Sequence, residues 1–166
     1  AALDPPARGA GDPGLRVRAR RRARHKWTRD ATPRAVALAI ARRTGWEGIE
    51  LRRGDFDAAI AAGRSAAQVL DLLRGSGLAV ACVGVELGWM FAEGPERKRL
   101  LQIFAEQCGR AVALGCPMLM SPSDMRRGDL RHAAASVREV GDIAARHGLR
   151  FGVEFMCQAE QFNTLE

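Results

Sequence analysis

The sequence predicts an α/β fold in which helices alternate with the strands of a parallel sheet. Gly45, Gly77, Gly115 and Gly148 recur every 32 to 38 residues. Each glycine follows a segment with helical apolar periodicity, and an apolar run of strand length comes directly after it. Glycine is favoured at such a place because a helix often ends on one residue in the left-handed conformation. Repeated helix–glycine–strand units of this length make right-handed crossovers and therefore a parallel sheet.

Length and composition fit one domain of this kind. The chain has 166 residues, of which 47% are hydrophobic, and no apolar run approaches the roughly 18 residues that a membrane span needs. The N-terminus lacks the pattern of a secretory signal. The four cysteines show no C-x-x-C spacing, which fits a reducing compartment and argues against a disulfide scaffold. We therefore predict a cytoplasmic protein without a membrane partner.

Most of the net positive charge belongs to the N-terminus. Residues 1–30 hold nine Lys/Arg and three Asp, whereas residues 31–166 hold seventeen basic and sixteen acidic residues. We predict a basic, disordered tail over residues 1–30 and a folded domain over residues 31–166. The basic run at 15–26 could bind a polyanion. No aromatic residue lies among its arginines to stack on bases, so a solvated extension is the preferred interpretation.

Each expected helix has its own start signal. The helices begin near Thr32, at Ser65 (with Gln68 in a capping-box pattern), at Pro95 and near Asp129. The expected strands cover residues 46–51, 78–87, 116–121 and 149–155. A further cap pattern begins at Asn163. The first strand of such a fold should come just before Trp27, where the chain is rich in arginine and poorly suited to a buried strand.

Three of the expected strands carry the same short pattern, Gly48-Ile49-Glu50, Gly84-Val85-Glu86 and Gly152-Val153-Glu154. Strand side chains alternate, so the glutamates share one face and the branched residues the other. No glycine-rich phosphate loop follows the first of these strands, as a doubly wound sheet would favour. We predict a partial (β/α)8 TIM barrel of about four to five β/α units. Its glutamates would lie at the C-terminal rim, where such barrels carry their active sites.

Glu154 is the strongest candidate for a functional residue. The run from Leu149 to Met156 is otherwise largely apolar, and ionised carboxylates are rarely buried unless they are paired or bind a metal. We predict substrate-binding roles for four further residues at the strand ends: Glu50, Arg52, Glu86 and Ser121. Alternatives stay open, because Glu50 could pair with Arg52 or Arg53 and Glu86 could be an exposed loop residue. The remaining strand ends in Ser121-Pro122-Ser123-Asp124, polar at the same level, and Asp124 could be a site residue or, as we prefer, a turn or cap residue.

Residues 41–52, 108–117 and 144–155, in this order and spacing, resemble the sugar phosphate isomerase/epimerase family with a xylose isomerase-like barrel. The likeness covers roughly residues 31–166. It implies that Glu154 is catalytic and is the first metal-binding glutamate, at the end of the fifth strand. In such enzymes two glutamates, an aspartate and a histidine hold one divalent cation. Hard oxygen ligands favour Mn²⁺ or Mg²⁺, with Zn²⁺ or Co²⁺ as alternatives.

The resemblance further implies a metal-dependent isomerase or epimerase that acts on a sugar or a keto-inositol. Its glutamates would move a proton beside the substrate carbonyl through an enediolate. The matching aspartate, histidine and second glutamate would follow Glu166, so we expect this chain alone to be inactive. One alternative is a DNA-repair endonuclease of the same barrel type. This alternative is disfavoured because the histidine ligands of such an endonuclease should lie on the early strands, and no early strand here ends in histidine. A nucleic-acid partner is disfavoured for the same reason. A second alternative is a non-catalytic half-barrel that binds a partner or a polyanion; a homo-oligomer is left open.

Overall fold

The computed structural model describes residues 23–24 and 34–164 of the chain. The strands are β1 (Ala23–Arg24), β2 (Gly48–Leu51), β3 (Ala79–Gly84), β4 (Met118–Pro122) and β5 (Arg150–Glu154). The helices are α1 (Arg34–Arg43), α2 (Gly54–Ala61), α3 (Ala66–Gly75), α4 (Gly94–Ala113) and α5 (Leu130–Arg146). This order confirms the predicted alternation of helices and strands.

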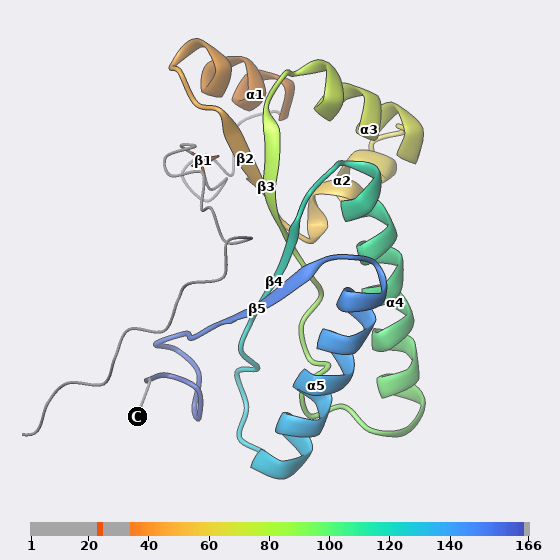
Figure 1. Ribbon diagram of the computed structural model, residues 1–166, viewed down its shortest axis with the longest axis vertical. Coiled ribbons are helices and arrows are strands. Elements are labelled where there is room, and N and C mark those ends of the chain that lie inside the picture. Colours follow the sequence, from red (N-terminus) through yellow and green to blue (C-terminus); the bar gives the residue numbers. More distant parts are fainter. Residues whose placement is uncertain (1–22, 25–33, 165–166) are drawn as a thin grey trace, which may run out of the picture.

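The five strands form one parallel sheet in the order of the sequence, β1-β2-β3-β4-β5. Figure 1 shows α3, α4 and α5 along one side of this sheet. The opposite side of the sheet is called the inner face here, because it corresponds to the interior of a closed barrel. A parallel sheet in sequential order with helices on one side is the arrangement of a partial (β/α)8 barrel.

The register of β2 and β3 determines which side chains share a face. Ile49 pairs with Val80, but the next residue, Glu50, pairs with Cys82. The extra residue, Ala81, forms a bulge, which inserts one residue on one strand and restores alternation beyond it. Glu50 and Cys82 therefore share the inner face.

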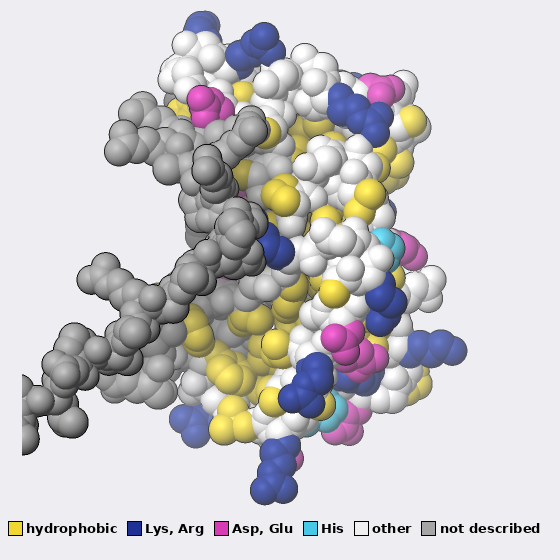
Figure 2. Space-filling model, viewed as in Figure 1, with side chains coloured by type: hydrophobic (Ala, Val, Ile, Leu, Met, Phe, Trp, Pro, Cys, Tyr) yellow, Lys and Arg dark blue, Asp and Glu magenta, His cyan; other side chains and the backbone are white. Residues whose placement is uncertain are grey.

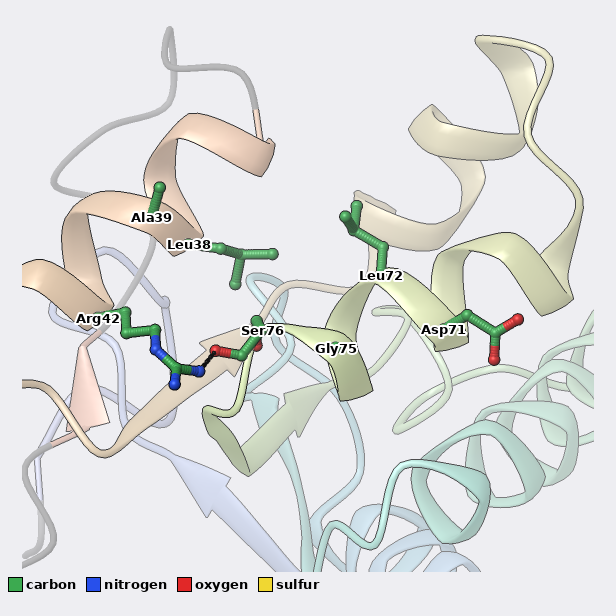
Figure 3. A pocket seen from close by; sticks show the side chains of 7 residues that line it. All are labelled: Leu38, Ala39, Arg42, Asp71, Leu72, Gly75 and Ser76. Carbon is green, nitrogen blue, oxygen red and sulfur yellow. Dashed lines mark hydrogen bonds between the residues drawn. The ribbon is translucent and has the colours of Figure 1, made fainter.

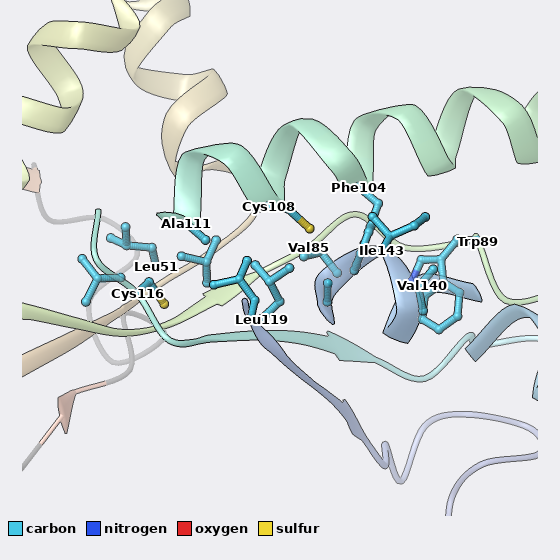
Figure 4. Close-up of a cluster of buried hydrophobic side chains, with 14 of the residues drawn as sticks. Leu51, Val85, Trp89, Phe104, Cys108, Ala111, Cys116, Leu119, Val140 and Ile143 are labelled. Carbon is cyan, nitrogen blue, oxygen red and sulfur yellow. The ribbon is translucent and has the colours of Figure 1, made fainter. Parts of the chain in front are cut away.

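The other face of the sheet packs against the helices. Leu51, Val85 and Leu119 are almost fully buried there, and Figure 4 shows Leu51 near Ala111 of α4 and Val85 and Leu119 near Cys108 of the same helix. The ring of Phe104 meets that of Phe151 edge-on, with 5.4 Å between the centroids. Burying side chains of this size contributes roughly 1.5–3 kcal/mol each, so this layer holds the sheet in place.

Several predicted start signals are confirmed. Ser65 caps α3, since its hydroxyl accepts from the Gln68 amide while the Gln68 side chain accepts from the Ser65 amide. The Asp129 carboxylate accepts from the amide of Arg131 at the start of α5. In the part of the chain that the structure describes, no helix is both long and apolar enough to cross a membrane.

Two features differ from the prediction. The two-residue strand β1 lies within the basic run and pairs with β2, although we predicted disorder over residues 1–30; the rest of that prediction lies outside the described residues. Helix α2 was not predicted. It begins where the buried Asp55 carboxylate accepts from the Arg52 amide while the Asp55 amide donates to the Arg52 carbonyl. An aspartate that closes such a turn favours a helix start.

Candidate active site

The predicted glutamates lie on the inner face or at its C-terminal rim. Glu50 is the third residue of β2, Glu86 follows β3 by two residues, and Glu154 ends β5. The branched neighbours Ile49 and Val85 are buried on the helix side, as the alternation predicts. The structure therefore brings the three carboxylates to one side of the sheet at its C-terminal end.

Cys82 lies between these carboxylates and was not among the predicted site residues. Burial, and to a smaller extent the negative charge of Glu50, the Cys116 thiol and the charge of Glu154, together raise the pKa of the Cys82 thiol to about 12. The Cys82 thiol is therefore neutral at physiological pH. Cys82 belongs to β3, which lies between β2 with Glu50 and β5 with Glu154 in the sheet. Counting alternate residues back from Glu86 would have placed Cys82 there.

Glu86 is held at the rim of β2 and β3. Its carboxylate lies 3.5 Å from Nε of Arg53, and its amide donates to the side chain of the buried Gln107 in α4. The ion pair thus joins Arg53 to Glu86. The amide of Arg52 donates to Asp55, so its backbone fixes the start of α2, and its side chain is half-buried beside β2.

Ser121 lies on the helix side of β4. It follows Leu119 by two residues, is 0% exposed, and its hydroxyl accepts from the Trp89 indole at 3.0 Å. The same hydroxyl donates to the Pro122 carbonyl. This position does not support the substrate-binding role that we predicted, because alternation turns Ser121 away from the inner face.

Glu154 is exposed, although the apolar run around it suggested a buried carboxylate. Among the described residues β5 pairs only with β4, so the other edge of this strand has no neighbouring strand to cover it. Figure 2 shows hydrophobic side chains at the surface around the place that β5 occupies in Figure 1. The prediction of burial is therefore wrong for this structure, while Glu154 does stand at the C-terminal end of its strand.

The segment after β5 folds across the loop that leaves β4. The Ser123 amide donates to the Glu154 carbonyl at 2.8 Å, and the Glu160 amide donates to the Met125 carbonyl at 3.0 Å. The side chain of Gln161 accepts from the Gly128 amide. These bonds hold the loop after β4 against the segment that follows Glu154.

Two phenylalanines complete this connection. The Phe162 ring stacks on the Phe91 ring, with centroids 6.2 Å apart. The Phe91 ring lies so close to Gly128 that a Cβ there would be 2.3 Å from it. The loops after β3, β4 and β5 therefore pack together at the C-terminal rim.

The residues of this rim provide only part of a metal site. In the part of the chain that the structure describes, no three His, Cys, Asp or Glu side chains gather in a metal-binding group. The donors that are present, Glu50 and Glu154, are carboxylates, which suit hard divalent cations. One further carboxylate oxygen, Oδ2 of Asp124, is buried without a hydrogen-bond partner. These residues fit such a cation as contributors to a donor set and not as a complete one.

A groove of about 640 Å³ lies elsewhere, between α1 and α3. Figure 3 shows Leu38 and Arg42 facing Leu72 and Ser76 across it, and the Arg42 guanidinium donates to the Ser76 carbonyl. Both helices reach this groove near their C-terminal ends, which precede the strands. The groove thus lies toward the N-terminal ends of the strands, the side of such barrels that contributes stability.

Comparison with known families identifies the class of this fold. Residues 38–166 match the family described as the xylose isomerase-like TIM barrel, and the chain belongs to this family. No curated protein matches the chain.

Solved structures agree with this assignment at the level of the fold. One is the IOLI protein with a bound zinc atom, at 12% identity and a TM-score of 0.71, covering 82% of this chain and 51% of that chain. A second is D-psicose 3-epimerase with D-tagatose from Clostridium cellulolyticum H10, at 16% identity and a TM-score of 0.65. The match covers 86% of this chain and 55% of that chain. A third is an AP endonuclease of family 2 from Brucella melitensis, at 19% identity and a TM-score of 0.62. The match covers 82% of this chain and 55% of that chain. The chain thus spans about half the length of these structures.

Proposed function

We propose that the chain supplies the first half of a metal-dependent isomerase or epimerase acting on a sugar or polyol ketone, with Glu154 as metal ligand and proton-transfer group. The observation that carries this proposal is the position of Glu50 and Glu154 toward the C-terminal ends of two strands of one parallel sheet, both on its inner face. The matched epimerase with D-tagatose and the matched zinc protein support a carbonyl sugar and a divalent cation.

The proposed roles follow from position. Glu154, exposed at the end of β5, would hold the proton taken from the carbon beside the carbonyl and return it. Glu50, one residue from the end of β2, would accept a hydrogen bond from a substrate hydroxyl. The neutral Cys82 thiol adds no charge between them. A divalent cation, when bound, would polarise the carbonyl and stabilise charge on its oxygen.

The test supplies the other half of the barrel. The chain is joined to the second half of the D-psicose 3-epimerase barrel, and the hybrid is checked for folding by circular dichroism and gel filtration. Exchange of the hydrogen beside the carbonyl of D-tagatose is followed by NMR in D₂O with Mn²⁺. We expect exchange in the hybrid, a loss of at least about 100-fold in Glu154→Gln, and none in the chain alone.

A matched control is Glu106→Gln, since Glu106 is an exposed glutamate on α4. This variant should exchange at the rate of the unsubstituted hybrid. The proposal is rejected if a folded hybrid shows no exchange, or if Glu154→Gln exchanges as fast as Glu106→Gln.

A further inference from the structure

We propose that β5 is a self-complementary edge strand, through which two copies of this chain pair antiparallel about a two-fold axis at Gly152. The partner is a second copy of the same chain, and the surface is the edge of β5 (Arg150–Glu154) that faces away from β4. The inference is carried by the placement of two opposite charges, Arg150 and Glu154, symmetrically about Gly152 on one face of this strand. It goes beyond the proposed function and does not depend on it.

The free edge of β5 presents backbone groups that another strand can bind. Among the described residues β5 pairs with β4 alone. The Arg150 amide donates to the residue just before β4, and the Glu154 carbonyl accepts from the residue just after it, so both turn their backbone groups toward β4. Those of Phe151 and Val153 therefore point to the other edge, because the direction alternates along a strand. Such a row of donors and acceptors is a template for pairing with another chain.

One antiparallel register satisfies both the backbone and the charges. If the two-fold axis passes through Gly152, Phe151 of one copy lies opposite Val153 of the second copy, and the two exchange N–H···O bonds. Arg150 then lies opposite Glu154 of the second copy in a non-hydrogen-bonded pair, where side chains approach most closely. By the symmetry of the axis the same ion pair forms twice. A register centred on Arg150 or on Glu154 would instead place like charges opposite each other, which is destabilising.

The side chains on both faces of β5 fit this pairing. Arg150 and Glu154 are exposed. Alternation places both on the inner face, because the Phe151 ring between them packs against Phe104 on the helix side. On that side Phe151 and Val153 are only partly buried, and an aromatic residue opposite a β-branched one is a favourable cross-strand pair. The pairing thus joins opposite charges on one face and apolar side chains on the other.

Gly152 allows the two copies to approach at the axis. In a non-hydrogen-bonded pair the Cα atoms are about 4.5 Å apart, and glycine brings no side chain into that space. A Cβ at Gly152 would lie 2.9 Å from Cε of Met118, which is the flexible end of that side chain, so a small side chain fits if Met118 moves. Two cysteines at this position would be within the range of a disulfide, about 4.4–6.8 Å between Cα atoms.

The experiment measures the oligomeric state by sedimentation velocity over a series of chain concentrations. The unsubstituted chain should show an equilibrium between monomer and dimer. Arg150→Glu and Glu154→Arg each place like charges opposite each other at both ends of the pair, so each should raise the dimer dissociation constant roughly tenfold to a hundredfold. The matched control is Arg138→Glu, the same charge change at an exposed residue of α5, which should leave that constant unchanged.

Mixing the two charge variants tests the register directly. An equimolar mixture of Arg150→Glu and Glu154→Arg should form the dimer that neither variant forms well alone, because opposite charges then face each other at both ends. No contact elsewhere on the chain predicts this recovery.

A cysteine substitution tests the position of the axis. In a Cys157→Ser background, which removes an exposed thiol, Gly152→Cys should form a disulfide-linked dimer with oxidised glutathione. Two protein thiols then become one disulfide, and oxidised glutathione takes up their two protons and two electrons as two glutathione thiols. Ala135→Cys, at an exposed position of α5, is the matched control and should link far less.

Circular dichroism confirms that each variant is folded before it is compared. The inference is overturned if the unsubstituted chain stays monomeric at every concentration, whatever else then covers the edge of β5. It is also overturned if the dimer persists in both charge variants, if their mixture does not recover it, or if a folded Gly152→Cys chain links no more than Ala135→Cys.

Discussion

Replacing Gly128 with alanine should separate the loops after β3, β4 and β5, which pack together at the C-terminal rim. A Cβ at this position would lie 2.3, 2.5 and 2.7 Å from three carbon atoms of the Phe91 ring. Carbon atoms do not approach so closely, so the ring must move, and its stack on Phe162 is lost. Overpacking of this kind costs about 1–3 kcal/mol, and a lost aromatic pair adds roughly 0.5–1.5 kcal/mol. We expect Gly128→Ala to lower the free energy of unfolding by about 1.5–4.5 kcal/mol.

Gly141 provides the matched substitution. It lies inside α5, and a Cβ there would meet no atom within 4 Å. Because alanine is favoured over glycine inside a helix by about 1 kcal/mol, Gly141→Ala should raise the free energy of unfolding. Urea titrations followed by circular dichroism measure both changes.

A double substitution tests the cause. If the Phe91 ring is what excludes a Cβ at Gly128, then adding Gly128→Ala to a Phe91→Leu chain should cost much less than adding it to the unsubstituted chain. Equal costs in the two backgrounds would refute the explanation by the Phe91 ring. So would a Gly128→Ala chain as stable as the unsubstituted one.

Three further predictions concern other parts of the chain. At pH 8 iodoacetamide should label the exposed Cys157 and leave Cys82 unmodified. The pKa of the Cys82 thiol, about 12, leaves roughly one Cys82 thiol in ten thousand as thiolate at this pH. Equal labelling of the two cysteines in peptide mass spectrometry would contradict this. Trp89→Phe removes the donor to Ser121 and should cost about 1–3 kcal/mol in urea unfolding, and an unchanged midpoint would contradict it. Ser65→Ala removes the cap of α3 and should cost about 1 kcal/mol, whereas Ser65→Gly should cost less.

The order of elements could be predicted because its signals are local. Gly45, Gly77, Gly115 and Gly148 adopt positive φ angles between 65° and 77° at the helix ends, which is the conformation that their spacing indicated. The alternation within Gly48-Ile49-Glu50 likewise needs only neighbouring residues. These features depend on the chain itself, and the structure agrees with them.

What could not be predicted depends on distant parts of the chain. The apolar sequence around Glu154 says nothing about whether another strand covers β5, and in the described residues none does. Ser121 was assigned to the rim because it is polar, although its neighbour Trp89 gives it a partner on the helix side. The unpartnered state of Asp124 depends on loops that meet only in three dimensions.

The order of the strands in the sheet also bears on how the protein is made. From β2 onward, each new strand pairs with the strand that was synthesised immediately before it. A ribosome releases such a chain one unit at a time, and each emerging strand finds its partner already present. Because synthesis, at about 5–20 residues per second, is slow beside helix and loop formation, the earlier units can assemble before β5 leaves the ribosome. The free edge then moves forward with the growing end of the chain.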